Sequence, residues 1–263
     1  MNLGLKNKVA IITGASKGIG KAIATNFAEE KAKITICSRN INNLKKTAET
    51  IEEKTGAIIL PIQTNLEKHE DIQKMVDETL KKFGRIDILI NNTGGPPPIK
   101  FIDTTEKYWQ KAVNQLLMST INCCYEVIPI MKKQGWGRII NMTSIAAKQP
   151  IDNLILSNSI RSGIHGLTKT LSNELAEYGI TVNAVCPGYT LTERVIDLAK
   201  ANALTSGKKY KDIIKKWEEQ IPIGRLGTTD EIANLVLFYA SEKASYITGN
   251  ITQVDGGYNK SII

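Results

Sequence analysis

Residues 8–24, KVAIITGASKGIGKAIA, contain the pattern from which the fold can be inferred. The apolar run at residues 9–12 is typical of a strand that is buried on both faces. Gly14, Gly18 and Gly20 follow, and the next apolar residues recur at helical spacing. In such a strand–turn–helix unit the glycines let the backbone approach a pyrophosphate, and the helix N-terminus offers free N–H groups. The stretch therefore predicts a nucleotide-binding turn, with an ordinary glycine-rich turn as the alternative.

The spacing of the glycines narrows the kind of turn. Thr13 precedes a Gly-x-x-x-Gly-x-Gly arrangement, instead of Gly-x-Gly-x-x-Gly. This arrangement resembles the cofactor turn of the short-chain dehydrogenase/reductase family, and within it the 3-oxoacyl-carrier-protein-reductase-like members. The resemblance implies that the turn binds a nicotinamide dinucleotide through Gly14, Ser16, Lys17, Gly18, Ile19 and Gly20.

Composition limits the classes of protein to consider. The chain has 263 residues, of which 42% are hydrophobic and 23% charged, as in one large globular domain. We expect no secretory signal and no membrane span, because no apolar run approaches ~20 residues. The four cysteines lack metal-ligand spacing, so we expect no metal site and reduced thiols in the cytoplasm. The net charge of +8 is spread over scattered lysines, so we expect neither nucleic acid nor membrane as a partner.

The second predicted strand, residues 33–37, indicates which nicotinamide cofactor fits. In a dinucleotide-binding fold this strand ends beside the adenosine ribose, where an acidic residue favours NAD. The chain has Ser38 and Arg39 there instead, and Lys17 lies in the neighbouring turn. Two cations favour a 2′-phosphate, so the sequence predicts NADP(H). The alternative is that both cations are solvated surface charges.

Later motifs extend the resemblance along the chain. Asn65-Leu66 stands where the family packs an acidic and an apolar residue by the adenine. Asn91-Asn92-Thr93-Gly94 resembles the family's N-N-A-G motif, whose Asn pair steadies the sheet. Pro187-Gly188, with Thr192 four residues on, resembles the loop that holds the nicotinamide. The further cofactor-binding residues implied are Ser38, Arg39, Asn65, Leu66, Asn92, Thr93, Gly94, Pro187, Gly188 and Thr192.

Strand and helix patterns alternate along the whole chain. Strands are predicted at residues 9–12, 33–37, 57–63, 86–90, 138–142, 180–185 and 251–254, and long helices at residues 67–83, 105–134, 154–178 and 229–241. The alternation predicts a single doubly wound Rossmann-type α/β domain over residues 1–263, a parallel sheet with helices on both faces. Residues 192–220, predicted helical, correspond to the family's substrate lid, and their lysines suggest an anionic substrate; a solvated helix face is the alternative.

The family's catalytic tetrad of Asn, Ser, Tyr and Lys is altered in this chain. Ser144 stands at the serine place, but counting along the helix puts Ser157 at the tyrosine place and Arg161 at the lysine place. Leu116 falls at the asparagine place, with Asn114 as the alternative. Ser144, Ser157 and Arg161 are therefore the candidate catalytic residues.

These changes alter the expected chemistry. A serine hydroxyl is far less acidic than a phenol, and arginine stays charged at neutral pH. Arginine can still hold ribose hydroxyls or a carboxylate, so we expect cofactor binding through Arg161 and little ordinary reductase activity. Lys148 and Tyr189 are candidate substitutes for the missing proton donor.

Three functions remain open at this stage. The first is an NADP-dependent oxidoreductase acting on a carbonyl or alcohol substrate. The second is a non-redox enzyme that uses Arg161 to clamp an anionic substrate, and the third is an NADP-binding protein without turnover. The resemblance also implies a homo-tetramer or homo-dimer, paired through the helices at residues 105–134 and 154–178.

Overall fold

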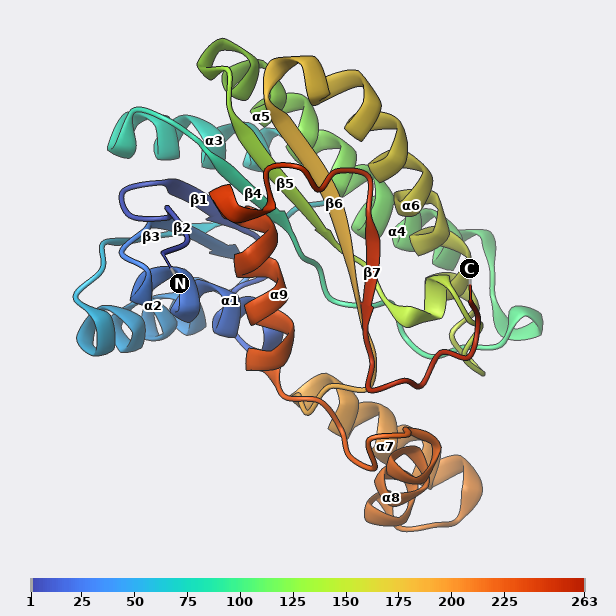
Figure 1. Cartoon of the computed structure of the whole chain (residues 1–263). Helices are drawn as coiled ribbons and strands as arrows, with labels where there is room; N and C mark the ends of the chain where they lie inside the picture. The colour runs from blue at the N-terminus through green and yellow to red at the C-terminus, as the bar shows by residue number, and fades with distance from the viewer. Residues whose placement is uncertain (1, 263) are drawn as a thin grey trace.

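A parallel sheet of seven strands forms the centre of the described chain, in the order β3-β2-β1-β4-β5-β6-β7 (Figure 1). The structure, a computed structural model, describes residues 2–262, apart from the side chain of Thr205. The chain leaves β3 at one edge and returns to pair β4 with β1, so the strand order reverses between β1 and β4. The strands are β1 (Val9–Ile12), β2 (Lys33–Ser38), β3 (Ile59–Gln63), β4 (Ile88–Asn91), β5 (Gly137–Met142), β6 (Ile180–Pro187) and β7 (Ile251–Val254).

Helices cover both faces of this sheet, as predicted. Ala10 and Ile12 of β1 belong to one buried apolar cluster and Ile11 to another, because successive side chains of a strand point to opposite faces. The first cluster includes α1 (Gly18–Glu29), α2 (Ile41–Thr55) and α9 (Thr229–Ala240). The second includes α3 (His69–Phe83), α5 (Ser119–Gln134) and α6 (Ile155–Leu175). The continuous apolar runs of the strands follow from this double covering.

The prediction of one helix over residues 105–134 is wrong. The segment divides into α4 (Glu106–Val113), a π-helical turn η2 (Asn114–Met118) and α5. A π-turn places one more residue in the turn than an α-helix, so it rotates the side chains that follow it. This rotation decides which residue of the segment reaches the site. Short 3₁₀ segments complete the structure: η1 (Phe101–Asp103), η3 (Ile145–Ala147), η4 (Ala176–Tyr178) and η5 (Glu242–Ala244).

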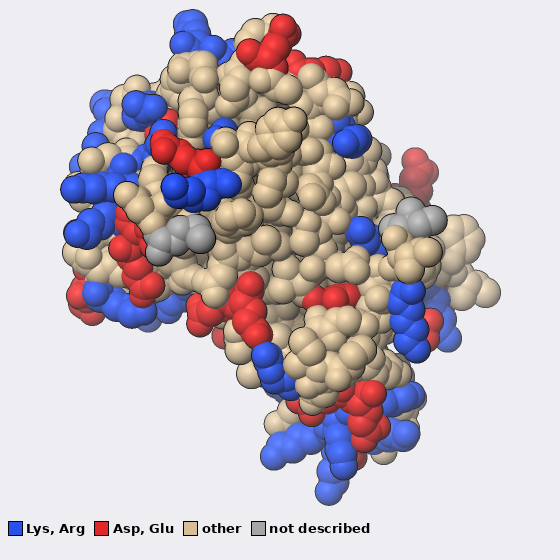
Figure 2. All heavy atoms as spheres, in the orientation of Figure 1, with Lys and Arg blue, Asp and Glu red and all other residues tan. Residues whose placement is uncertain are grey.

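The predicted lid forms a separate lobe beyond the sheet (Figure 1). It is two helices, α7 (Glu193–Ser206) and α8 (Tyr210–Gln220), because Gly207 ends α7 in a left-handed conformation with φ +67°. Ile213 and Trp217 turn inward to an apolar cluster. The lid lysines Lys208, Lys209, Lys211, Lys215 and Lys216 are exposed. Figure 2 shows basic side chains interspersed with acidic ones on this lobe.

Large apolar side chains lie exposed at η1 and on α5. Phe101 is 70% exposed, Ile102 85% and Tyr125 67%. Exposed apolar side chains of this size are compatible with burial between copies of the chain, and the oligomer stays a prediction. Within residues 2–262, no helix is long and apolar enough to cross a membrane.

Candidate active site

One cavity of about 520 Å³ lies along the carboxyl ends of β1, β2, β4, β5 and β6. Ligands of open parallel sheets bind at this edge, where the strand order reverses. The structure brings the expected cofactor-binding residues and the three candidate catalytic residues into the wall of this one cavity: Gly14, Ser16, Lys17, Gly18, Ile19, Gly20, Ser38, Arg39, Asn65, Leu66, Asn92, Thr93, Gly94, Ser144, Ser157, Arg161, Pro187, Gly188 and Thr192.

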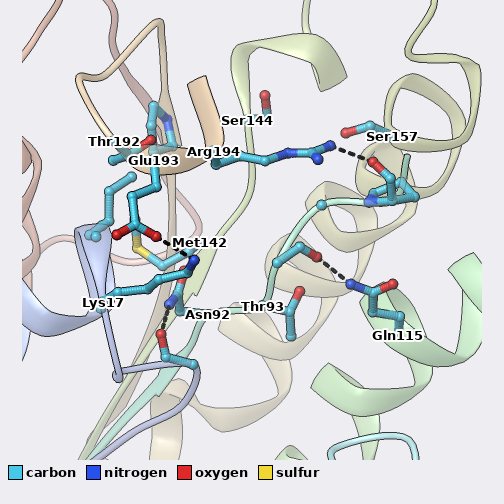
Figure 3. Close-up of a pocket in the computed structure, with 18 of the residues that line it drawn as sticks. Lys17, Asn92, Thr93, Gln115, Met142, Ser144, Ser157, Thr192, Glu193 and Arg194 are labelled. Carbon is cyan, nitrogen blue, oxygen red and sulfur yellow. Dashed lines mark hydrogen bonds and ion pairs between the residues drawn. The ribbon is translucent and has the colours of Figure 1, made fainter. Parts of the chain in front are cut away.

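The glycine turn has the shape that a pyrophosphate needs. Gly14 has φ +59°, and a Cβ there would lie 2.6 Å from the carbonyl oxygen of Asn92. Asn92 holds the turn by donating its Nδ2 to the carbonyls of Thr13 at 3.1 Å and Gly14 at 3.2 Å (Figure 3). No side chain caps the N-terminus of α1, and its first turn contains no acidic residue. The first N–H groups of α1 are therefore available to a phosphate, and the turn fits a dinucleotide.

The other asparagine of the pair ties the sheet to the helix that bears the candidate catalytic residues. Asn91 donates from Nδ2 to Asn141 Oδ1 at 2.9 Å, and Asn141 donates to the hydroxyl of Thr168 at 2.9 Å. These buried bonds join β4 to β5 and β5 to α6. They agree with the expected steadying role of the Asn pair.

Lys17 and Arg39, the two cations at the adenosine end, differ in whether they are already ion-paired. Lys17 forms an ion pair with Glu193 across the cavity mouth, and this contact lowers the pKa of Glu193 (Figure 3). Both side chains are about two-thirds exposed. Such an exposed pair contributes only about 0–1 kcal/mol and is readily exchanged for another anion. Within the described chain Arg39 has no ion pair, so its guanidinium is the freer of the two cations.

Ser144 and Ser157 present hydroxyls at the other end of the cavity. Ser144 accepts a hydrogen bond from the backbone N–H of Ala146 at 3.1 Å, which leaves its own proton free to donate. Ser157 is buried in the wall, and its hydroxyl makes no hydrogen bond to any other described residue. Ser157 and Arg161 lie one helical turn apart on the same face of α6, as the i, i+4 spacing predicted.

Arg161 is a buried cation that has no carboxylate partner in the part of the chain that the structure describes. It is 6% exposed, and Nη1 donates to the carbonyls of Met142 at 3.0 Å and Thr143 at 3.1 Å. Nε has no hydrogen-bond partner among residues 2–262. Burial lowers the pKa of Arg161 to about 10, and the charge of Arg194 acts in the same direction. The guanidinium nevertheless stays charged at neutral pH.

Neither residue considered for the asparagine place reaches the cavity; Gln115 lines it instead. Its Nε2 donates to the carbonyl of Gly94 at 2.6 Å (Figure 3). Leu116 is fully buried in an apolar cluster with α6, and Asn114 accepts from Gln110. The prediction of Leu116 at the site is therefore wrong. It assumed an uninterrupted α-helix, whereas the π-helical turn changes which residue faces the cavity.

The candidate substitutes for the proton donor are poorly suited to that role. Tyr189 lines the cavity, but it is stacked on Trp217 at 4.6 Å, and burial raises the pKa of its hydroxyl. Lys148 is not among the cavity-lining residues. His165 hydrogen-bonds to Thr143 at 3.1 Å, and burial, with Lys148 nearby, lowers its pKa to about 4.

Three charged residues of the cavity wall, Glu67, Glu193 and Arg194, are not predicted as site residues by the sequence patterns. The side chain of greatest interest is that of Arg194 on α7. Its Nη2 donates to the carbonyl of Pro96, on the loop after β4. In Figure 3 its guanidinium lies between Ser144 and Ser157. Its position two residues after Thr192 is the sequence feature that could have indicated a place near the site. Only the fold shows that the side chain extends to the loop after β4.

The doubly wound sheet and the glycine turn at its switch point define a dinucleotide-binding Rossmann protein. The family described as Enoyl-(Acyl carrier protein) reductase matches residues 14–259. A 3-oxoacyl-[acyl-carrier-protein] reductase FabG of Staphylococcus epidermidis is 37% identical over 254 residues, which cover 95% of this chain and 98% of that one. The FabG of Aquifex aeolicus is 34% identical, over 98% and 99% of the two chains.

A solved structure agrees with these relatives. L-sorbose reductase from Gluconobacter frateurii, complexed with NADPH and L-sorbose, superposes with a TM-score of 0.95 at 33% identity over the whole of both chains. The chain belongs to the short-chain dehydrogenase/reductase family of NAD(P)(H)-dependent oxidoreductases.

Proposed function

We propose that this chain is an NADP(H)-dependent oxidoreductase that interconverts a carbonyl compound and an alcohol with non-standard residues at the reacting end. The observation that supports it is the continuity of one cavity from Arg39, past the glycine turn, to Ser144 and Arg161. When bound, the cofactor supplies or accepts a hydride at its nicotinamide ring.

The adenosine end selects the cofactor by charge. Arg39 and Lys17 donate charge-assisted hydrogen bonds to the 2′-phosphate of NADP(H). Lys17 exchanges Glu193 for the phosphate at little cost, because that ion pair is exposed. L-sorbose reductase, which superposes on the whole chain, is complexed with NADPH, and this supports the same choice of cofactor.

The middle of the cavity holds the pyrophosphate and the nicotinamide. The free N–H groups at the start of α1 bind phosphate oxygens, and Thr192 lines the cavity opposite them. Pro187 and Gly188 line the wall at the nicotinamide end. Gly188 packs closely against Asp255, because a Cβ on Gly188 would lie 2.7 Å from it. Arg161, fixed by its bonds to Met142 and Thr143, donates to the ribose hydroxyls.

The reacting end orients the substrate better than it protonates it. Ser144 donates its free proton to the substrate oxygen, and Ser157 offers a second hydroxyl beside it. Neither hydroxyl is acidic enough at neutral pH to act as a phenol activated by a lysine does. Proton transfer is therefore slow, and turnover is low compared with a relative that has the tyrosine and the lysine.

Binding and turnover are tested separately. NADPH and NADH are titrated into the protein by calorimetry, and NADPH consumption is then followed over a panel of ketones, with NADP⁺ reduction over the matching alcohols. We expect tighter binding of NADPH and slow but measurable turnover. Binding without turnover on either panel would reduce the protein to a cofactor-binding role, and failure to bind NADPH would reject the proposal.

A further inference from the structure

The reacting end of the cavity contains an unbalanced positive charge. Arg161 and Arg194 both line it, and within the described chain neither forms an ion pair with a carboxylate. The acid at the cavity mouth, Glu193, is already paired with Lys17. Asp197 raises the pKa of Arg194 from a distance but makes no ion pair with it. The charge of these two guanidiniums is therefore not compensated within the described residues.

The cost of this arrangement without an anion falls on Arg161, because Arg161 is buried whereas Arg194 is exposed. Desolvation lowers the pKa of both arginines, and the charge of Arg194 acts on Arg161 in the same direction. Arg161 is only 6% exposed, and its Nε has no partner among the described residues. A buried cation without a counter-ion is stabilised when an anion binds beside it.

The position of Arg194 places this charge beside the substrate. In the view of Figure 3 its guanidinium is drawn between Ser144 and Ser157, all three residues line the same cavity, and its charge acts on Arg161. Serine at residue 157 leaves free the volume that a tyrosine ring would take. The guanidinium also contacts the loop after β4, where Nη2 donates to the carbonyl of Pro96.

The lid lysines do not account for an anionic substrate. The cavity wall includes Arg194, Val195 and Leu198 of α7 but no residue of α8. The lysines of α8 point away from the buried cluster formed by Ile213 and Trp217 and are exposed. The basic residues placed to bind a charged substrate group next to the reacting carbon are therefore those of α6 and α7.

We propose that Arg194, with Arg161 behind it, binds a substrate carboxylate next to the reacting carbonyl. The substrate class is then a small oxo acid or the corresponding hydroxy acid. This inference rests on the proposed function, whose substrate oxygen is held by Ser144. The arginine fork donates to the carboxylate with charge-assisted hydrogen bonds, and the carboxylate is not changed in the reaction.

The test uses unreactive carboxylates and their neutral amides. Oxamate and malonate, and separately oxamide and malonamide, are titrated by calorimetry into the protein saturated with NADPH. We expect at least one carboxylate to bind roughly tenfold to hundredfold more tightly than its amide, as a charged hydrogen bond predicts. Equal binding of carboxylate and amide, or binding of neither carboxylate, would overturn the inference.

Matched variants locate the charge. Arg194→Gln should remove most of the preference for carboxylate and Arg194→Lys should retain part of it, whereas NADPH affinity should change less than about twofold in both. Lys200→Gln, which removes an exposed charge from the same helix outside the cavity wall, is the control and should bind like the parent protein. Thermal melts check that each variant is folded. An equal effect in Arg194→Gln and Lys200→Gln would count against a specific site.

Other outcomes separate this inference from the proposed function. If Arg194→Gln weakens NADPH binding as much as carboxylate binding, Arg194 serves the cofactor phosphates and the inference fails alone. If carboxylates bind through Arg194 but no oxo acid is reduced by NADPH, the anion site stands and the redox function fails.

Discussion

Replacing Arg161 by methionine separates cofactor binding from stability. Burial lowers the pKa of Arg161 to about 10, which corresponds to about 3 kcal/mol against the charged form. Two hydrogen bonds from a charged group, to the carbonyls of Met142 and Thr143, contribute roughly 1.5–3 kcal/mol each in the opposite direction. The two bonds offset the cost of burial and leave about 0–3 kcal/mol in favour of the arginine, and a methionine refills much of the volume. We therefore expect the free energy of unfolding to fall by less than about 3 kcal/mol.

No opposing contribution offsets the loss of Arg161 in NADPH binding. Losing a charged donor to the ribose should weaken NADPH binding by roughly 1.5–3 kcal/mol, or about tenfold to hundredfold. The assay is calorimetric titration of NADPH into the parent protein and Arg161→Met, with urea unfolding of both. Ser162→Ala, at an exposed position on the same helix, is the control. A loss of more than about 3 kcal/mol in stability with unchanged NADPH affinity would contradict this expectation, because Arg161 would then only join α6 to β5.

Three further predictions test other parts of the site. Arg39→Asp should reverse the preference from NADPH to NADH in titrations; equal affinities for the two cofactors in the parent protein would contradict this. His165 has its pKa lowered from 6.5 to about 4, so between these values the unfolded chain binds a proton that the folded chain does not, and stability falls as the pH falls through that window. His165→Gln should lose less stability from pH 6.5 to 4 in urea unfolding, and an identical loss would show that His165 contributes nothing. Combining Gln115→Asn, Ser157→Tyr and Arg161→Lys should raise ketone reduction by NADPH, and the same triple variant with asparagine at residue 116 instead of 115 should not; the reverse ranking would show that the asparagine belongs at residue 116.

Much of the site could be predicted because its motifs are local and stand at strand ends. Gly14, Asn92, Ser144 and Pro187 each follow or end a predicted strand. In a parallel sheet those carboxyl ends meet at one edge, so residues far apart in sequence line one cavity without any further information. The i, i+4 spacing placed Ser157 with Arg161 for the same reason: the geometry of one regular element is enough.

Features that depend on irregular backbone or on long side chains required the folded structure. Gln115, and not Leu116, lines the cavity because a π-helical turn rotates this segment, and the apolar pattern does not reveal such a turn. Lys17 pairs with Glu193, and His69 pairs with Glu126 at 2.6 Å, over separations of many residues that no local pattern reveals.

Arg194 shows most clearly where sequence patterns stop being informative. Its charge is plain in the printed chain, but its neighbour in space is Pro96, 98 positions away. The direction of a long, flexible side chain depends on packing and desolvation. For Arg194 it is therefore determined only when the lid lobe, the loop after β4 and the sheet are assembled. Local patterns were therefore enough to establish the fold and the place of the site, whereas long-range contacts determined which charges face the substrate.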